Sequence, residues 1–352
     1  MTPIAVEVPD TLDELLTPEW LTAALSARFP GVDITGVTRG PVVERLSTNA
    51  RFRIEGAREL PAGLSPTLCV KGYFSDVGRT IAGVGEPEAC FYRDLADTIG
   101  VRTLHAVWAD VNPQTRHGVV ITEDVVAADG VFLDALSPYS VEQTARSLEQ
   151  LARLHAFAWD DPARVDATWL VPRVASALQT RGVNEIRGNF EGPNGVGVPE
   201  AIRDPEALVD AFGTLAAGQP GPGWTVIHGD THVGNAFLDA EGRPGLLDWQ
   251  LVQHGHWSID VGYHIASALD PAERADAERD LLTHYLDQLR AEGVSPPPFD
   301  EAWTDYRRAI AYGFFLWGIT LYVSPDVIAA LLHRLGTAAL ELDSYAALAG
   351  GR

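Results

Sequence analysis

Three oxygen-bearing side chains, Asp230, Asn235 and Asp248, lie close together in the sequence, beside short runs of strand-forming residues. The runs predict strands at 225–227, 236–238 and 245–247, with a turn rich in Asp, Gly and Pro between the last two. Because the polar residues follow strand ends, we expect the three side chains to converge at one end of a hairpin. A carboxylate and an amide oxygen, with positions left for water and phosphate oxygens, suit Mg²⁺ better than zinc. Asp230 is then free to orient a hydroxyl nucleophile.

Lys71 is the only lysine of the 352-residue chain, and every other residue counted among its 26 Lys and Arg is an arginine. It lies in a run of strand formers, residues 67–74. A lysine ammonium is a compact point charge that can reach a phosphate oxygen inside a narrow cleft. The alternative is a lysine at a sheet edge without a special role.

Glu88 lies in a segment that predicts a helix over about residues 86–99, with a proline near its start and a glycine after its end. It shares its helix face with the apolar residues Phe91, Leu95 and Ile99. Burying an unpaired carboxylate costs several kcal/mol, so we expect Glu88 to pair with Lys71. The alternative is that Glu88 lies at the edge of the apolar stripe and reaches water.

Three motifs together resemble the aminoglycoside phosphotransferase and choline kinase-like superfamily, whose members are small-molecule relatives of the protein kinases. The motifs are His228-Gly-Asp230-Thr-His232-Val-Gly-Asn235, Asp248-Trp-Gln250 and Asp260-Val-Gly-Tyr263. The five-residue step from Asp230 to Asn235 and the later Asp248 repeat the kinase order of catalytic and metal-binding residues. Lys71 and Glu88 look like the phosphate-contacting lysine and its helix partner. The Asp-Trp-Gln form is most similar to the ecdysteroid-kinase and choline-kinase-like branch.

The resemblance implies a role for each of these residues. Asp230 is the catalytic base, Asn235 and Asp248 hold Mg²⁺, and Lys71, with Glu88 beside it, contacts the α- and β-phosphates. His228 and Asp260 support the catalytic loop. In phosphoryl transfer most of the catalysis is positioning and charge neutralisation, and these roles supply both.

Two further segments are candidates for nucleotide contact by the same resemblance. Ser47, Thr48 and Asn49 lie between two strand-like runs, where their hydroxyls and backbone N–H groups could cover phosphates, although the usual glycines are absent. A plain hairpin turn is the alternative. The backbone of Glu123 and Val125 resembles the hinge that meets the adenine, and an ordinary strand followed by a turn is the alternative.

The fold expected from the resemblance is α+β and two-lobed, like a protein kinase. Residues 1–123 form a nucleotide-binding N-lobe, a small antiparallel sheet with one helix. Residues 124–352 form a mostly helical C-lobe with the catalytic hairpin and the acceptor-binding helices. Ser140 and Gln143 form a capping-box pattern at the start of one helix, and His155 is expected to be a hydrogen-bonded core residue.

The composition argues against nucleic acids and anionic membranes as partners. The chain has 26 Lys and Arg against 48 Asp and Glu, a formal net charge of −22. Nucleic acids and anionic membranes need a basic surface, so neither is an expected partner. The two cysteines, Cys69 and Cys90, are too few for a disulfide framework, and we expect both to be buried. Without a secretory signal or an apolar run of roughly 18 residues, a cytoplasmic location is expected.

The leading hypothesis is an ATP- and Mg²⁺-dependent kinase, with GTP as an alternative donor, that phosphorylates a hydroxyl of a small molecule. The acidic balance suits a cationic acceptor such as an aminoglycoside or choline, whereas aromatic C-terminal helices suit an apolar alcohol such as a steroid. One alternative is a kinase-like module that binds nucleotide without catalysis. The other is a metal-dependent hydrolase that uses His228, Asp230, His232, Asp248, His254 and His256.

Overall fold

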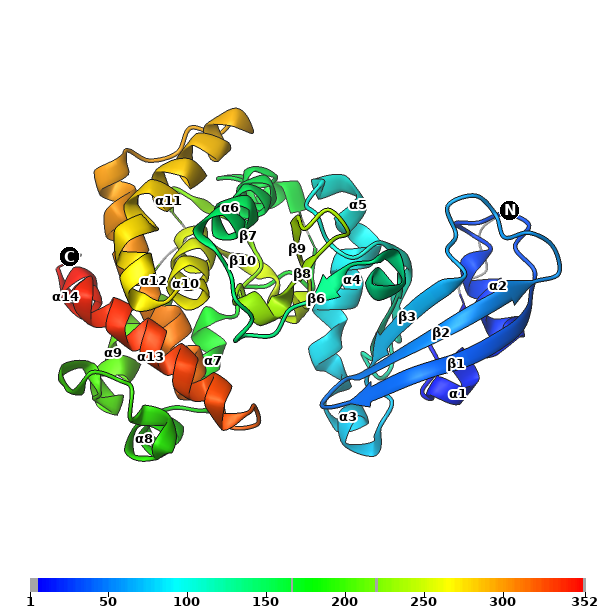
Figure 1. Ribbon diagram of the computed structural model, residues 1–352, viewed down its shortest axis with the longest axis horizontal. Helices are drawn as coiled ribbons and strands as arrows, with labels where there is room; N and C mark the ends of the chain where they lie inside the picture. Colours follow the sequence, from blue (N-terminus) through cyan, green and yellow to red (C-terminus); the bar gives the residue numbers. More distant parts are fainter. Residues whose placement is uncertain (1–5, 166, 219–220, 351–352) are drawn as a thin grey trace. The chain divides into compact units, whose positions relative to one another are not determined.

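The computed structural model describes residues 6–165, 167–218 and 221–350. The chain divides into two compact units (Figure 1). Unit 1 consists of Met1–Val131 and Asp248–Gln250, and unit 2 consists of Phe132–Leu247 and Leu251–Arg352. The three residues Asp248–Gln250 therefore belong with the N-terminal unit although the chain on either side of them belongs to unit 2. The expected lobe boundary after residue 123 stays a prediction.

Unit 1 is built on a five-stranded antiparallel sheet in the order β1-β2-β3-β5-β4. Figure 1 shows β1, β2 and β3 side by side. The strands are β1 (Ile34–Glu44), β2 (Thr48–Gly56), β3 (Thr67–Gly72), β4 (Ala106–Val111) and β5 (Gly118–Glu123). Side chains alternate between the two faces of a strand, so Leu68 and Val70 of β3 are buried on one face while Lys71 lies on the other. The small antiparallel sheet expected for the N-lobe is confirmed.

Helices lie on both faces of this sheet. α1 (Leu12–Leu15) and α2 (Pro18–Leu25) bury leucines in the core that contains Leu68 and Val70. α4 (Glu86–Asp94) lies on the side of Lys71, and short α3 (Asp76–Thr80) comes before it in the chain. α1, α2 and α3 were not predicted from the sequence.

The helix predicted over residues 86–99 is interrupted. α4 ends at Asp94 and α5 (Ala96–Ile99) follows, because Leu95 leaves the helical conformation at φ −124°. The Leu95 amide still donates to Phe91 O at 2.9 Å. Gly100 ends α5 at φ 74°, a left-handed conformation that favours glycine, as its position after the helix predicted.

The cysteines differ in their surroundings. Cys90 on α4 is buried, as predicted. Cys69 is only half-buried, because it lies on the same face of β3 as Lys71 rather than on the face with Leu68 and Val70. Burial raises the pKa of each thiol to about 11, so neither is a reactive thiolate at neutral pH.

Unit 2 is mostly helical. Its helices are α6 (Val141–Ala156), α7 (Ala177–Thr180), α8 (Val183–Glu191), α9 (Pro205–Ala216), α10 (Ser258–Ala268), α11 (Pro271–Ala291), α12 (Phe299–Gly318), α13 (Pro325–Glu341) and α14 (Ser344–Ala349). Ser140 and Gln143 form the predicted capping box at the start of α6. Every residue of α10 is buried, so this helix is the centre of the unit (Figure 1). In the part of the chain that the structure describes, all helices are too short or too polar to span a bilayer.

Short strands of unit 2 carry the predicted hairpin. β7 (Trp224–Ile227) pairs antiparallel with β10 (Gln253–His256), and β8 (Ala236–Leu238) pairs with β9 (Pro244–Leu246). Strands were expected at the positions of β7, β8 and β9, but β10 was not predicted. The loop between β7 and β8 holds Asp230 and Asn235.

Candidate active site

In unit 1, Lys71 makes two ion pairs. Its Nζ lies 2.6 Å from Glu88 Oε2 and 2.9 Å from Asp248 Oδ1. Glu88 is buried on α4, and the Lys71 side chain keeps 19% of its surface exposed. The predicted pair between Lys71 and Glu88 is present, so the carboxylate on the inward helix face does have a cation.

Burial and neighbouring charges shift the pKa values of this cluster. Burial raises the pKa of Glu88, and the nearby ammonium opposes that rise. Burial alone lowers the pKa of Lys71, but the carboxylates of Asp248 and Glu88 raise it well above its ordinary value, so the ammonium stays charged. Two carboxylates thus share one ammonium.

The segment Asp248–Gln250 is anchored to unit 1 by each of its side chains. Asp248 pairs with Lys71. The indole of Trp249 stacks on Phe91 of α4, with ring centroids 3.7 Å apart and planes 14° from parallel, and its Nε1 donates to Thr103 Oγ1 at 2.9 Å. Tyr73 OH donates to Gln250 Oε1 at 3.3 Å. Asp248 itself adopts a left-handed conformation at φ 64°, which costs a non-glycine residue about 1–3 kcal/mol.

The β1–β2 hairpin separates the three residues proposed to cover phosphates. Asn49 lies directly opposite Lys71 of β3, so the two side chains share one face of the sheet. Thr48 lies opposite Gly72 on the other face and is only 2% exposed. Ser47 lies in the turn, where its Oγ accepts from Asn49 Nδ2 at 3.5 Å. Asn49 is therefore the residue of this segment that is best placed to act with Lys71.

The expected hinge follows β5. The Glu123 amide donates to His105 O at 3.0 Å, and the Glu123 carboxylate lies 3.2 Å from His105 Nδ1. Val125 begins a short 3₁₀ helix, Val125–Ala128, that is capped by the side chain of Asp124. Adenine contact by these residues stays a prediction.

In unit 2, Asp260 holds the loop that carries Asp230. Its carboxylate is fully buried on α10 and accepts from the amides of His228 (2.7 Å) and Gly229 (2.8 Å) and from His155 Nε2 (3.1 Å). Burial alone raises the pKa of Asp260, but these hydrogen bonds and the nearby imidazoles lower it, so the carboxylate is ionised. His155 is the hydrogen-bonded core histidine that the sequence analysis expected.

Two more side chains shape the loop around Asp230. His228 Nδ1 accepts from the Asp230 amide at 3.2 Å, so its other nitrogen, Nε2, donates to Leu247 O at 3.0 Å. Asn235 Nδ2 donates to Asp230 O at 2.9 Å. Because the amide nitrogen of Asn235 is used in this way, its Oδ1 is the atom suited to bind a cation.

Asp230 receives a hydrogen bond from a residue to which the sequence analysis gave no separate role. Tyr263 OH lies 3.2 Å from Asp230 Oδ1, and Trp317 Nε1 lies 2.6 Å from Tyr263 OH. The signal that could have found Tyr263 is its position three residues after Asp260, which places both on one face of α10. Trp317 comes from a distant helix, α12, and no local pattern marks it.

Residues 126–294 match the family model described as the phosphotransferase enzyme family. The matched segment contains the loop from His228 to Asn235, the Asp248–Gln250 segment and Asp260. No curated protein sequence matches the chain at a significant level.

Solved structures share the fold of this chain. Choline kinase from Cryptosporidium parvum is 12% identical, with 95% of this chain and 96% of that one covered and a TM-score of 0.54. A choline/ethanolamine kinase family protein from Mesorhizobium loti is 16% identical, with 95% and 99% covered and a TM-score of 0.51. The GDP complex of aminoglycoside 2′-phosphotransferase-IIIa is 14% identical, with 92% and 99% covered and a TM-score of 0.51.

The family match and the shared fold confirm the resemblance to the aminoglycoside phosphotransferase and choline kinase-like superfamily. They confirm the expected α+β fold as well, with a small antiparallel-sheet lobe and a larger helical lobe. Assignment of this chain to the ecdysteroid-kinase and choline-kinase-like branch stays a prediction. The predicted roles of the individual site residues likewise stay predictions.

The donor atoms of the two predicted metal ligands are oxygens, which suit magnesium better than a transition metal. Asp248 and Asn235 offer oxygen atoms, and Mg²⁺ commonly binds one or two such protein ligands and completes its shell with water and phosphate oxygens. Among the residues that the structure describes, no three His, Cys, Asp or Glu side chains are grouped to hold one metal ion. Both ring nitrogens of His228 are used in hydrogen bonds, which does not support its role in a zinc hydrolase.

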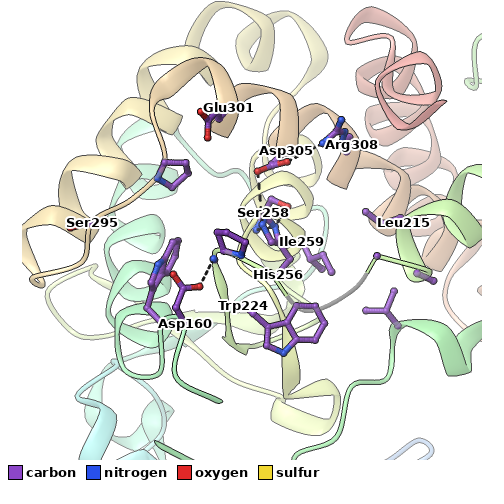
Figure 2. A pocket seen from close by; sticks show the side chains of 18 residues that line it. Asp160, Leu215, Trp224, His256, Ser258, Ile259, Ser295, Glu301, Asp305 and Arg308 are labelled. Carbon is purple, nitrogen blue, oxygen red and sulfur yellow. Dashed lines mark hydrogen bonds and ion pairs between the residues drawn. The ribbon is translucent and has the colours of Figure 1, made fainter. Parts of the chain in front are cut away.

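A cavity of about 550 Å³ lies in unit 2, and Asp230 is not among the residues that line it (Figure 2). Trp224, at the start of β7, lines the cavity. Asp230 lies in the loop that follows the other end of this strand. Figure 2 shows His256 and Asp305 as neighbours in its lining, with His256 Nε2 3.9 Å from Asp305 Oδ2. His256 Nδ1 also lies 2.7 Å from Ser258 Oγ, the side chain of the first residue of α10. Of the residues named in the sequence analysis as candidates for a site, His256 of the hydrolase alternative lines this cavity, and the predicted kinase residues do not.

Proposed function

We propose that this chain is an ATP- and Mg²⁺-dependent phosphotransferase that moves the γ-phosphate of the nucleotide to a hydroxyl of a small molecule. The observation that carries the proposal is the loop geometry of unit 2. Asp260 holds the amides of His228 and Gly229, and Asn235 holds the carbonyl of Asp230. This arrangement supports a fixed carboxylate at Asp230 next to an amide oxygen suited to a metal.

Asp230 is proposed to be the general base. It accepts the proton of the acceptor hydroxyl as the new oxygen–phosphorus bond forms and the bond to the leaving β-phosphate oxygen breaks. Phosphoryl transfer asks little covalent chemistry of a protein, so the main task of Asp230 is to orient the nucleophile. The side chain is near the surface of the loop, with 17% of its area exposed, which leaves it accessible to an acceptor.

Asn235 and Asp248 are proposed to hold Mg²⁺. When bound, the metal ion neutralises charge on the phosphate oxygens. The ion pair between Asp248 and Lys71 supports this assignment, because it keeps the Asp248 carboxylate beside the ammonium that is proposed to contact the phosphates. Lys71 is proposed to contact the α- and β-phosphates, and Glu88 keeps its ammonium in place.

The donor and the acceptor are proposed by class. ATP is the expected donor, and the GDP bound to aminoglycoside 2′-phosphotransferase-IIIa makes GTP the second nucleotide to test. The names of the similar structures suggest choline, ethanolamine and aminoglycosides as acceptors, all of which are cations. A net charge of −22 is compatible with such acceptors. A nucleotide donor also favours the cytoplasmic location expected from the sequence.

Nucleotide binding is tested by thermal unfolding with ATP, with GTP and with neither, each with and without Mg²⁺. A ligand at about 100 times its dissociation constant adds about 2.7 kcal/mol of stability, which raises the midpoint by several degrees in a chain of this size. We expect a shift that depends on Mg²⁺. No shift with either nucleotide would contradict the proposal.

The alternative function is a module that binds nucleotide without catalysis. It predicts the same thermal shift, so the two are separated by turnover. The presence of Lys71, Glu88, Asp230, Asn235 and Asp248 in one chain supports the enzyme.

A further inference from the structure

Two hydrogen bonds lead from α12 to the carboxylate of Asp230. Trp317 Nε1 lies 2.6 Å from Tyr263 OH, and Tyr263 OH lies 3.2 Å from Asp230 Oδ1. An indole nitrogen can only donate, so the Tyr263 oxygen accepts from Trp317. The proton of Tyr263 is then directed to the carboxylate, which can only accept when ionised. The direction of both bonds follows from the chemistry of the three side chains.

We propose that Tyr263 and Trp317 are positioning residues for Asp230, which hold its Oδ1 so that Oδ2 receives the proton of the acceptor hydroxyl. This inference rests on the proposed role of Asp230 as the base. His232 Nε2 also lies on the side of Oδ1, at 3.8 Å. Within the described part of unit 2, no hydrogen bond reaches Oδ2. The two oxygens of Asp230 thus have different surroundings, one held by the protein and the other left for the acceptor.

Packing fixes the orientation of both rings. Tyr263 is 1% exposed on α10, and Trp317 is 5% exposed on α12. Gly313 lies one turn before Trp317, and a Cβ atom there would lie 2.4 Å from Tyr263 Cδ2. Only glycine lets the backbone of α12 approach the Tyr263 ring this closely. The ring of His232 meets the Trp317 indole edge-on, with centroids 5.3 Å apart.

The surroundings also keep Tyr263 a donor. Burial and the nearby Asp230 carboxylate raise the pKa of Tyr263 well above its ordinary value, so its hydroxyl stays protonated. The hydrogen bond from Trp317 polarises this hydroxyl and strengthens its donation to Asp230, as in other buried chains of hydrogen bonds. Trp317 therefore acts on Asp230 only through Tyr263.

This dependence predicts a specific pattern of variant activities. Tyr263→Phe removes one hydrogen bond to a charged group, and we expect kcat to fall about tenfold with KM within about twofold. Trp317→Phe removes only the donor behind Tyr263, so we expect a fall of about threefold. The double variant should be no slower than Tyr263→Phe, because Trp317 has no effect on the base once the Tyr263 hydroxyl is gone.

Turnover of Mg-ATP is measured with four acceptors in turn: choline, ethanolamine, an aminoglycoside and water. The acceptor that gives the fastest turnover is then used for all variants. Tyr306→Phe is the matched control, since Tyr306 is a buried tyrosine of α12 that donates to Glu278 rather than to the loop. We expect this control to retain the kcat of the unaltered protein. Multiplicative losses in the double variant, or a Tyr263→Phe enzyme with unchanged kcat, would overturn the inference. No turnover with any acceptor would contradict the proposed function and the inference with it.

An NMR measurement without substrate separates a failure of this inference from a failure of the proposed function. The chain has nine tryptophans, and the indole N–H resonance of Trp317 is identified in a ¹⁵N spectrum by its loss in Trp317→Phe. We expect this resonance to move in Tyr263→Phe and in Asp230→Asn, but not in Tyr306→Phe. If it does not move in Asp230→Asn, Trp317 is not coupled to Asp230 and the inference is wrong, whatever the activity. If it moves but Asp230→Asn retains full turnover, the proposed role of Asp230 is wrong and the inference is lost with it.

Discussion

Protonation of His264 is expected to destabilise the fold between about pH 6.5 and pH 4. His264 lies on α10 and is 1% exposed, and its Nδ1 donates to Thr231 O in the Asp230 loop at 2.7 Å. Burial lowers the pKa of His264 from 6.5 to about 4. The unfolded chain therefore binds a proton near pH 6.5 that the folded chain does not accept until about pH 4. As the pH falls through this window, the free energy of unfolding decreases.

The size of the effect follows from the two pKa values. One pKa unit corresponds to about 1.4 kcal/mol, so the full window corresponds to about 3 kcal/mol, of which about 2.5 kcal/mol is lost by pH 4.5. This is a large fraction of the roughly 5–15 kcal/mol that stabilises a typical domain. The loss should appear as a lower midpoint of urea unfolding at pH 4.5 than at pH 7.

His264→Asn isolates the contribution of this residue. The amide nitrogen of Asn takes the position of Nδ1 and can still donate to Thr231 O, but it does not titrate. Between pH 7 and pH 4.5 we expect the unaltered protein to lose about 2.5 kcal/mol more unfolding free energy than the variant. The other buried histidines with lowered pKa values, His117 and His256, are present in both proteins and cancel in the comparison. Equal losses in the two proteins would refute the reasoning.

Three further variants test other parts of the account. Asp248→Ala removes a partner of Lys71 and a proposed metal ligand, so we expect calorimetry to show Mg-ATP binding at least about tenfold weaker; normal binding would disprove the ligand assignment. Gly229→Ala places a Cβ atom 2.5 Å from Leu251 O at φ 81°, so urea unfolding should show a loss of about 1–3 kcal/mol, and an equally stable variant would contradict the loop geometry. Trp249→Leu removes the stack on Phe91 and should lower the melting temperature by several degrees, whereas an unchanged value would show that this stack contributes little.

Local patterns were enough to predict many of the elements. The strand around Lys71, the capping box at Ser140 and the turn between β8 and β9 depend on neighbouring residues, so the sequence shows them directly. The Lys71–Glu88 pair was predictable because a carboxylate on an apolar helix face needs a nearby cation. The family resemblance was also visible in the sequence, because it depends on the order and spacing of Asp230, Asn235 and Asp248.

Long-range packing explains what the sequence analysis missed. β7 pairs with β10, and nothing in the short run Gln253–His256 indicates that partner. Trp317 reaches Tyr263 only because Gly313 allows α12 to pack closely on α10. α1 and α2 are short, and the buried leucines of the sheet core decide where they pack. Asp248–Gln250 joins unit 1 through contacts with residues more than 140 positions away, such as Thr103.

Phosphoryl transfer itself tests the central claim most directly. The unaltered protein and Asp230→Asn are incubated with Mg-ATP and a panel of choline, ethanolamine, aminoglycosides and alcohols, and phosphorylated product is followed by ³¹P NMR. We expect the unaltered protein to phosphorylate at least one acceptor. We expect Asp230→Asn to bind Mg-ATP normally and to turn over about 10²- to 10⁴-fold more slowly, because the substitution removes the base without removing a metal ligand. Equal turnover by the two proteins would contradict the role of Asp230, and no product from the unaltered protein would contradict the kinase activity.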